Sequence, residues 1–144
     1  MTWLLAWGAV WAAPAVLVVG DSLSAAYGIA EDRGWVALLQ RRLAEAGYPH
    51  RVVNASASGE TSVGGRNRLP RLLAEHAPAV VVLELGANDG LRGIAPQVLG
   101  ENLTAMIAAA RDAGARVLLL GVRLPPNYGA AFNARFERVY ASVA

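Results

Sequence analysis

The stretch AVLVVGDSLS (residues 15–24) decides the fold of this chain. Its first five residues are apolar and mostly β-branched, and Pro14 and Gly20 bound them. A continuous apolar run of this length is typical of a strand that is buried on both faces, as in a parallel sheet. Gly20 permits a sharp turn, so Ser22 lies just beyond the carboxyl end of the predicted strand. Ligands of open α/β sheets bind at this end, which makes Ser22 a candidate functional residue.

The composition predicts one globular domain and leaves little support for several function classes. The chain has 144 residues, of which 55% are hydrophobic and 17% charged, with a formal net charge of +2. All the basic residues are arginines and they are scattered along the chain, so a nucleic-acid partner is not expected. Without cysteine the chain has no disulfide, thiolate nucleophile or thiolate metal site. The two histidines, His50 and His76, lie far apart in the sequence, so no metal site is expected either.

The first twelve residues, MTWLLAWGAVWA, differ in character from the rest of the chain. They are apolar, and small side chains near Ala12 are compatible with cleavage by signal peptidase after that residue. We therefore predict a signal peptide over residues 1–12, a domain over residues 13–144, and a periplasmic or secreted location. The alternative is an apolar N-terminal extension packed on the domain. The apolar run over residues 3–19 is short for a membrane span and contains Gly8 and Pro14, so no integral span is expected.

Apolar runs and helical patterns alternate along the rest of the chain. The expected strands cover residues 15–19, 50–54, 79–85 and 116–122, and the expected helices residues 35–46, 69–76, 96–113 and 132–143. An earlier helical turn can cover residues 61–68, with Pro70 then acceptable only in the first turn of the next helix. This order predicts a three-layer α/β/α domain with a parallel sheet of at least four strands, flavodoxin-like in type, joined by right-handed crossovers.

Three polar loops follow the carboxyl ends of the first three predicted strands. Their sequences are Gly20-Asp21-Ser22, Ser58-Gly59-Glu60 and Gly86-Ala87-Asn88-Asp89-Gly90, the last a turn by composition. Because parallel strands end at the same edge of a sheet, Ser22, Gly59 and Asn88 can converge. A hydroxyl, an unhindered backbone N–H and a side-chain amide together suit acyl transfer, in which two donors hold the developing oxyanion.

These residues alone leave other interpretations open. A serine after a strand is often a turn or helix-capping residue, and Gly59 or Asn-Asp-Gly can be ordinary turn residues. The first turn has neither dinucleotide-binding nor P-loop glycine spacing, and the chain lacks the G-x-S-x-G elbow of α/β-hydrolases. Asp21, Glu60 and Asp89 also follow strands, so a paired-carboxylate glycosidase remains open. Asp21 is expected to organise the turn, because an ordinary carboxylate is a weak base for a serine hydroxyl.

Four motifs in one order give the chain a resemblance to a known family. GDSLS (residues 20–24) resembles the first block of the GDSL, or SGNH, hydrolases. NASASGETS (residues 54–62) and GANDGLRG (residues 86–93) resemble their glycine and asparagine blocks. RLPPNYG (residues 123–129) is similar to a loop in the branch that contains thioesterase I/protease I/lysophospholipase L1 and arylesterases. The resemblance extends over about residues 13–144.

The resemblance implies a serine ester hydrolase without a metal or organic cofactor. Ser22 would be the nucleophile and the first oxyanion donor, with the Gly59 N–H and the Asn88 side chain as the second and third. Fatty-acyl or aryl esters, acyl thioesters and lysophospholipids would be the substrates, with the acyl chain along the loops that follow Asn88 and Arg123. The residues expected to bind the substrate are Asp89, Gly90, Leu91, Pro125, Asn127 and Tyr128.

The family's last block, Asp-x-x-His, is absent from this sequence. Its histidine would be the general base for Ser22, and its aspartate would orient that histidine. His50 begins the second predicted strand and His76 precedes the third, which places both at the edge of the sheet opposite Ser22. We therefore expect a C-terminally truncated sequence that lacks the last strand and helix and is inactive without its histidine, with the fourth strand as an unpaired edge. The alternatives are a non-catalytic acyl-binding domain and a protein completed by a partner chain.

Overall fold

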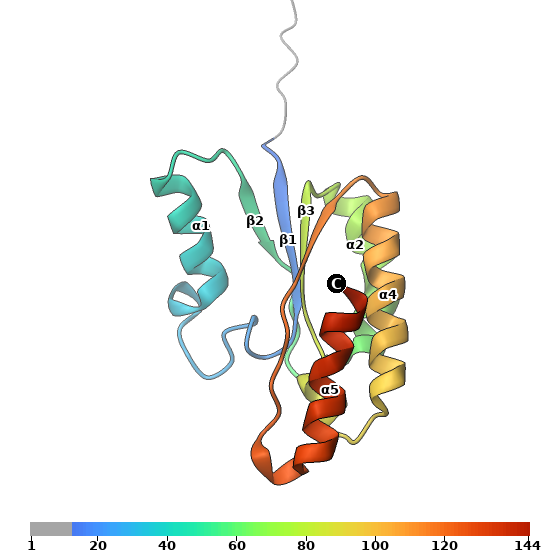
Figure 1. The fold of residues 1–144 in the computed structure, drawn as a ribbon. Coiled ribbons are helices and arrows are strands. Elements are labelled where there is room, and N and C mark those ends of the chain that lie inside the picture. The colour runs from blue at the N-terminus through green and yellow to red at the C-terminus, as the bar shows by residue number, and fades with distance from the viewer. Residues whose placement is uncertain (1–12) are drawn as a thin grey trace, which may run out of the picture.

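A computed structural model describes residues 13–144, and its centre is a parallel sheet of four strands (Figure 1). The order of the strands across the sheet is β2-β1-β3-β4. Their bounds are β1 Ala15–Gly20, β2 Arg51–Asn54, β3 Val80–Glu84 and β4 Arg116–Leu119. The predicted α/β fold is thus confirmed, and β4 is an edge strand within the described part of the chain.

Helices cover both faces of the sheet. Their bounds are α1 Trp35–Glu45, α2 Ser62–His76, α3 Ala87–Leu91, α4 Pro96–Asp112 and α5 Ala130–Val143, and 3₁₀ turns lie at Glu31–Arg33 and Pro126–Tyr128. Figure 1 shows α1 on one side of the sheet and α2, α4 and α5 on the other. Within residues 13–144 no helix is both long and apolar enough to cross a membrane.

The burial of β1 follows from its position between β2 and β3. All six of its residues are buried, as the continuous apolar run predicts. Leu17 and Val19 pack into the larger core with α2, α4 and α5, whereas Val16 and Val18 pack against Val36 of α1. Alternate side chains of β1 therefore pack against the helices on both faces of the sheet. Ser22 follows the carboxyl end of this strand, so it lies at the edge of the sheet.

The fourth strand ends at Leu119, three residues before its predicted end. Two further predicted features differ from the structure. Residues 62–76 form one helix, so Pro70 lies inside α2 and not in a first turn. The residues expected to form a turn at 86–90 instead begin the short helix α3 after Gly86, whose φ is +125°. Long-range contacts account for the second difference, because Asp89 is fully buried and bonded to the start of α2.

Candidate active site

The turn that carries Ser22 begins at the carboxyl end of β1. Two backbone bonds shape it, from the Ala25 N–H to the Asp21 carbonyl (2.9 Å) and from the Tyr27 N–H to the Ser22 carbonyl (3.0 Å). Asp21 is fully buried, and its Oδ1 accepts a hydrogen bond from the Leu23 N–H at 2.9 Å. Asp21 therefore organises the turn, and Ser22 stays partly accessible at its start.

Asn88 links the three loops that the sequence predicts to converge. It lies in the first turn of α3, and its Nδ2 donates to the Glu60 carbonyl at 2.9 Å. The same nitrogen donates to Asp21 Oδ2 at 3.3 Å. One side-chain amide thus contacts the loop after β1 and the loop after β2 from its own position after β3.

Gly59 lies in the second of these loops in a left-handed conformation. Its φ is +78°, which glycine adopts without the strain that a Cβ atom would cause. Arg92 Nη2 donates to the Gly59 carbonyl at 2.9 Å, and the Ala57 N–H donates to the Gly20 carbonyl at 3.0 Å. The loop is therefore fixed to both β1 and the end of α3.

An arginine that sequence reasoning missed also holds this loop. Arg68 of α2 donates from Nε to Glu60 Oε2 at 2.7 Å and from Nη2 to the Ala55 carbonyl at 2.8 Å. An arginine among thirteen scattered ones gives no sequence signal for this role, because its partners depend on how α2 packs.

Asp89 and Gly90 are buried, although both were expected to bind substrate. The carboxylate of Asp89 accepts hydrogen bonds from the Ser62 N–H at 2.8 Å and from the Ser62 hydroxyl. Asn102 of α4 donates to the same hydroxyl at 2.9 Å. Asp89 thus connects α3 directly to α2 and, through Ser62, to α4. These bonds hold the backbone next to Asn88 in place.

Gly90 brings α3 against the loop that follows β4. A Cβ atom at this position would lie 2.5 Å from both methyl carbons of Leu124. The two segments expected to bind the acyl chain are therefore neighbours. Leu91, Pro125 and Asn127 are exposed and Tyr128 is half-buried.

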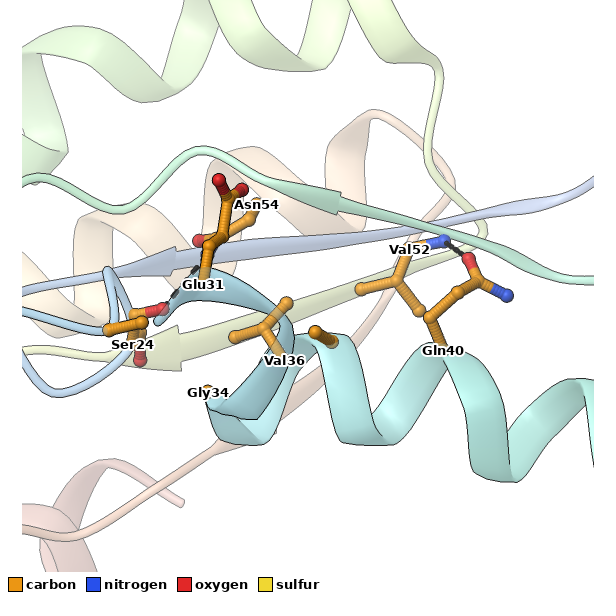
Figure 2. Close-up of a pocket in the computed structure, with 9 residues that line it drawn as sticks. Ser24, Glu31, Gly34, Val36, Gln40, Val52 and Asn54 are labelled. Carbon is orange, nitrogen blue, oxygen red and sulfur yellow. Dashed lines mark hydrogen bonds between the residues drawn. The ribbon is translucent and has the colours of Figure 1, made fainter. Parts of the chain in front are cut away.

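A second polar cluster lies behind the Ser22 turn, on the α1 side of the sheet. Ser24 Oγ donates to Glu84 Oε2 of β3 at 2.6 Å and accepts from Trp35 Nε1 at 3.2 Å. Asn54 Nδ2 donates to the Ser24 carbonyl at 2.8 Å. Figure 2 shows Ser24 and Asn54 on the wall of a pocket of about 320 Å³ beside α1. Burial raises the pKa of Glu84, and the nearby charge of Asp21 adds to this effect.

The two histidines lie at the opposite edge of the sheet from Ser22. The pairing of Ala15 with Arg51 places His50 beside the amino end of β1, and His76 ends α2 just before β3. The six residues of β1 span about 20 Å. Since a general base must approach within about 3 Å of the proton that it removes, neither histidine can serve Ser22.

Comparison with known proteins shows the family of this chain. The sequence model of the GDSL-like Lipase/Acylhydrolase family matches residues 18–144. The chain belongs to this family. Esterase TesA of Pseudomonas aeruginosa is 62% identical over 133 residues, which are 92% of this chain and 66% of that protein. Arylesterase of Vibrio mimicus is 46% identical over 129 residues (90% and 64%). Thioesterase 1/protease 1/lysophospholipase L1 of Escherichia coli K12 is 44% identical over 133 residues (92% and 62%).

Solved structures of GDSL-like hydrolases share the fold. The crystal structure of TesA has a TM-score of 0.89 at 62% identity and covers 90% of this chain and 72% of that one. The esterase EstA from Pseudoalteromonas sp., inhibited by monoethylphosphonate, has a TM-score of 0.85 at 41% identity (90% and 70%). The present chain spans slightly less than two thirds of the length of the curated relatives.

Proposed function

We propose that the protein is a serine ester hydrolase that acts on acyl esters, acyl thioesters or lysophospholipids through an acyl-enzyme at Ser22. The observation that carries the proposal is the position of Asn88, whose amide donates to both the Glu60 carbonyl and Asp21. Through these two hydrogen bonds the amide lies next to both the turn that carries Ser22 and the loop that carries Gly59. Membership of the GDSL-like Lipase/Acylhydrolase family and the names of the relatives support the same reaction class.

In the proposed reaction the Ser22 hydroxyl attacks the carbonyl carbon of the ester. The carbonyl oxygen then carries negative charge, and the N–H groups of Ser22 and Gly59 and the Asn88 amide donate to it. The 3.3 Å contact from Asn88 to Asp21 is longer than its 2.9 Å bond to Glu60. An oxyanion would therefore compete for the hydrogen that faces Asp21, while the bond to Glu60 holds the amide in place.

Collapse of this intermediate expels the alcohol or thiol and leaves the acyl group on the Ser22 oxygen. Water then attacks the acyl-enzyme, releases the carboxylic acid and restores the serine. Both steps need a general base. It takes the proton from Ser22 and passes it to the leaving alcohol or thiol, and it then takes a proton from water and returns it to the Ser22 oxygen. The proposal requires this base from outside residues 13–144. Inhibition of EstA by a phosphonate supports the mechanism, because tetrahedral phosphorus mimics the tetrahedral intermediate.

The acyl chain is proposed to lie along α3 and the loop after β4. Leu91 is 49% exposed, and Pro125, Asn127 and Tyr128 form the facing loop. Of the expected substrate residues, Asp89 and Gly90 would act by holding the backbone of α3, since both are buried.

The test of the function is ester hydrolysis by the complete protein before and after Ser22→Ala. We expect p-nitrophenyl butyrate to be hydrolysed and Ser22→Ala to lower kcat by at least about a thousandfold, because the nucleophile is lost. Ser142→Ala is the matched control, since Ser142 is exposed and its hydroxyl donates to the Val139 carbonyl of its own helix α5. Unchanged hydrolysis by Ser22→Ala would contradict the proposal.

A non-catalytic acyl-binding domain is the second candidate. The observation that favours it is the distance of both histidines from Ser22. This candidate predicts that a fatty acid or lysophospholipid binds to the complete protein, for example by calorimetry, without turnover of any ester. Turnover that depends on Ser22 excludes it.

Residues 1–12, the predicted signal peptide, lie outside the described residues. We propose export to the periplasm or the medium with cleavage after Ala12. The proposal rests on the apolar sequence of residues 1–12, which is similar to that of a signal peptide. The N-terminal sequence of the mature protein tests this, and an intact Met1 terminus on exported protein would contradict it.

A further inference from the structure

We infer that Glu84 and Ser24 are positioning residues, which hold the turn that carries Ser22, after β1, in register with the turn that carries Asn88, after β3. The inference rests on the proposed function, because it concerns the distance between the nucleophile and an oxyanion donor. It assigns a role in the reaction to two buried side chains that contact neither the substrate nor the reacting atoms.

Glu84 is placed where it can connect the two turns. It is the last residue of β3 and stands opposite Gly20, the last residue of β1. Its Oε2 accepts the 2.6 Å hydrogen bond from Ser24, which lies two residues after Ser22. Asn88 follows Glu84 by four residues. One side-chain bond thus joins the segments that carry the nucleophile and the amide donor.

The absence of a side chain at Gly20 is part of this arrangement. A Cβ atom there would lie 2.5 Å from Ser24 Oγ and 2.9 Å from Glu84 Oε2. Glycine therefore leaves the space that the hydrogen bond occupies. Trp35 of α1 donates to the Ser24 hydroxyl and so restricts its direction. Asn54 of β2 donates to the Ser24 carbonyl and holds its backbone (Figure 2).

The buried carboxyl group of Glu84 lowers the stability of the folded protein more than a residue that only fills space would. Glu84 is 6% exposed, and its Oε1 has no hydrogen-bond partner among the described residues. Burying a carboxyl group with an unpaired oxygen disfavours the folded state, whereas an apolar side chain of similar volume would not. What the carboxyl group supplies is an acceptor for Ser24.

The Ser24–Glu84 bond complements the contact between Asn88 and Asp21. That contact connects the same two turns one residue before Ser22, at 3.3 Å. Ser22 therefore lies between two connections, one from Asp21 to Asn88 of α3 and one from Ser24 to Glu84 of β3. When the Asn88 amide donates to the oxyanion in place of Asp21, the Ser24–Glu84 bond is the connection that still holds the nucleophile at a short distance from the amide donor.

The test compares kcat, KM and the melting temperature of the complete protein with those of Ser24→Ala, Glu84→Leu and Glu84→Gln. Misplacement of reacting groups by about 1 Å can cost about 100-fold in rate. We expect Ser24→Ala and Glu84→Leu each to lower kcat by about 10- to 100-fold while KM changes less than about threefold. Glu84→Gln retains a carbonyl acceptor for Ser24 and is expected to keep kcat within about threefold of the parent.

The double variant supplies a further check. If the two residues act through one bond, Ser24→Ala has almost no additional effect on kcat in the Glu84→Leu background. Glu101→Gln, on the exposed side of α4, and Ser142→Ala are the matched controls. Ser24→Ala removes a single oxygen atom, so it carries the test if Glu84→Leu fails to fold.

Two results would overturn the inference. One is a kcat within about twofold of the parent in Ser24→Ala, in protein whose Ser22→Ala variant is inactive. The other is a loss of activity that matches the loss of folded protein, with kcat per folded molecule unchanged. Full activity of Ser22→Ala would instead overturn the proposed function.

Discussion

Each of the acidic residues at the carboxyl edge of the sheet has a different internal partner. Asp21 accepts from the Leu23 N–H and from Asn88, Glu60 pairs with Arg68, and Asp89 bonds to Ser62. These carboxylates therefore hold the loops together. The paired-carboxylate glycosidase that the sequence left open loses its support, because each candidate acid or base is already engaged.

Glu84 makes a specific contribution to the dependence of stability on pH. Its pKa in the folded protein is raised by burial. As the pH rises above about 4.3, an unfolded-state glutamate ionises while the folded state still holds the proton. Unfolding then releases a proton, so the free energy of unfolding falls with pH until the folded-state pKa is passed.

The measurement is urea denaturation of the protein and of Glu84→Gln at several values between about pH 4 and pH 8. Because glutamine does not titrate, the stability of the parent relative to this variant is expected to decrease across that range. The exposed Glu101→Gln variant should show no such trend. A difference that stays constant or grows with pH would show that Glu84 is not held protonated by burial.

At the scale of the elements, hydrophobic pattern was sufficient for the strands and for α4. The apolar residues of α4 recur at helical spacing and are buried as expected: Leu99, Leu103, Met106, Ile107 and Ala110. Local pattern failed where local preference and packing disagree. Pro70 and the Asn-Asp-Gly sequence are typical of a helix boundary and a turn, yet α2 continues through the proline and α3 begins at Ala87.

Pro70 is expected to lower the stability of α2. It is the ninth of fifteen helical residues and has no N–H to donate to the Arg66 carbonyl. Pro70→Ala restores the donor, and we expect it to raise the free energy of unfolding by about 1–3 kcal/mol, reduced by the greater freedom of the unfolded chain.

Pro96→Ala is the matched control for this prediction. Pro96 is at the start of α4, where proline is well tolerated, so its replacement should leave stability unchanged or slightly lower. Urea denaturation measures both variants. A Pro70→Ala protein that is no more stable than the Pro96→Ala protein would contradict the account of α2.

At the scale of the whole molecule, the sequence was sufficient for the layer order and for the convergence of the three loops. Strand ends in a parallel sheet share an edge, so the proximity of the loops of Ser22, Gly59 and Asn88 follows from topology alone. The bonds that stabilise this edge could not be predicted. Ser24 and Glu84 are 60 residues apart, and Ser62 and Asp89 are 27 apart. Such pairs depend on how whole elements pack and leave no local pattern.

Ser22 is proposed to be the nucleophile, and covalent labelling tests this role most directly. The complete protein is treated with a fluorophosphonate, digested and analysed by mass spectrometry, with Ser22→Ala as the control. We expect one phosphonyl adduct, on the peptide that contains Gly20-Asp21-Ser22, and none in the variant. An adduct on another residue, or ester hydrolysis without any adduct at Ser22, would contradict the claim.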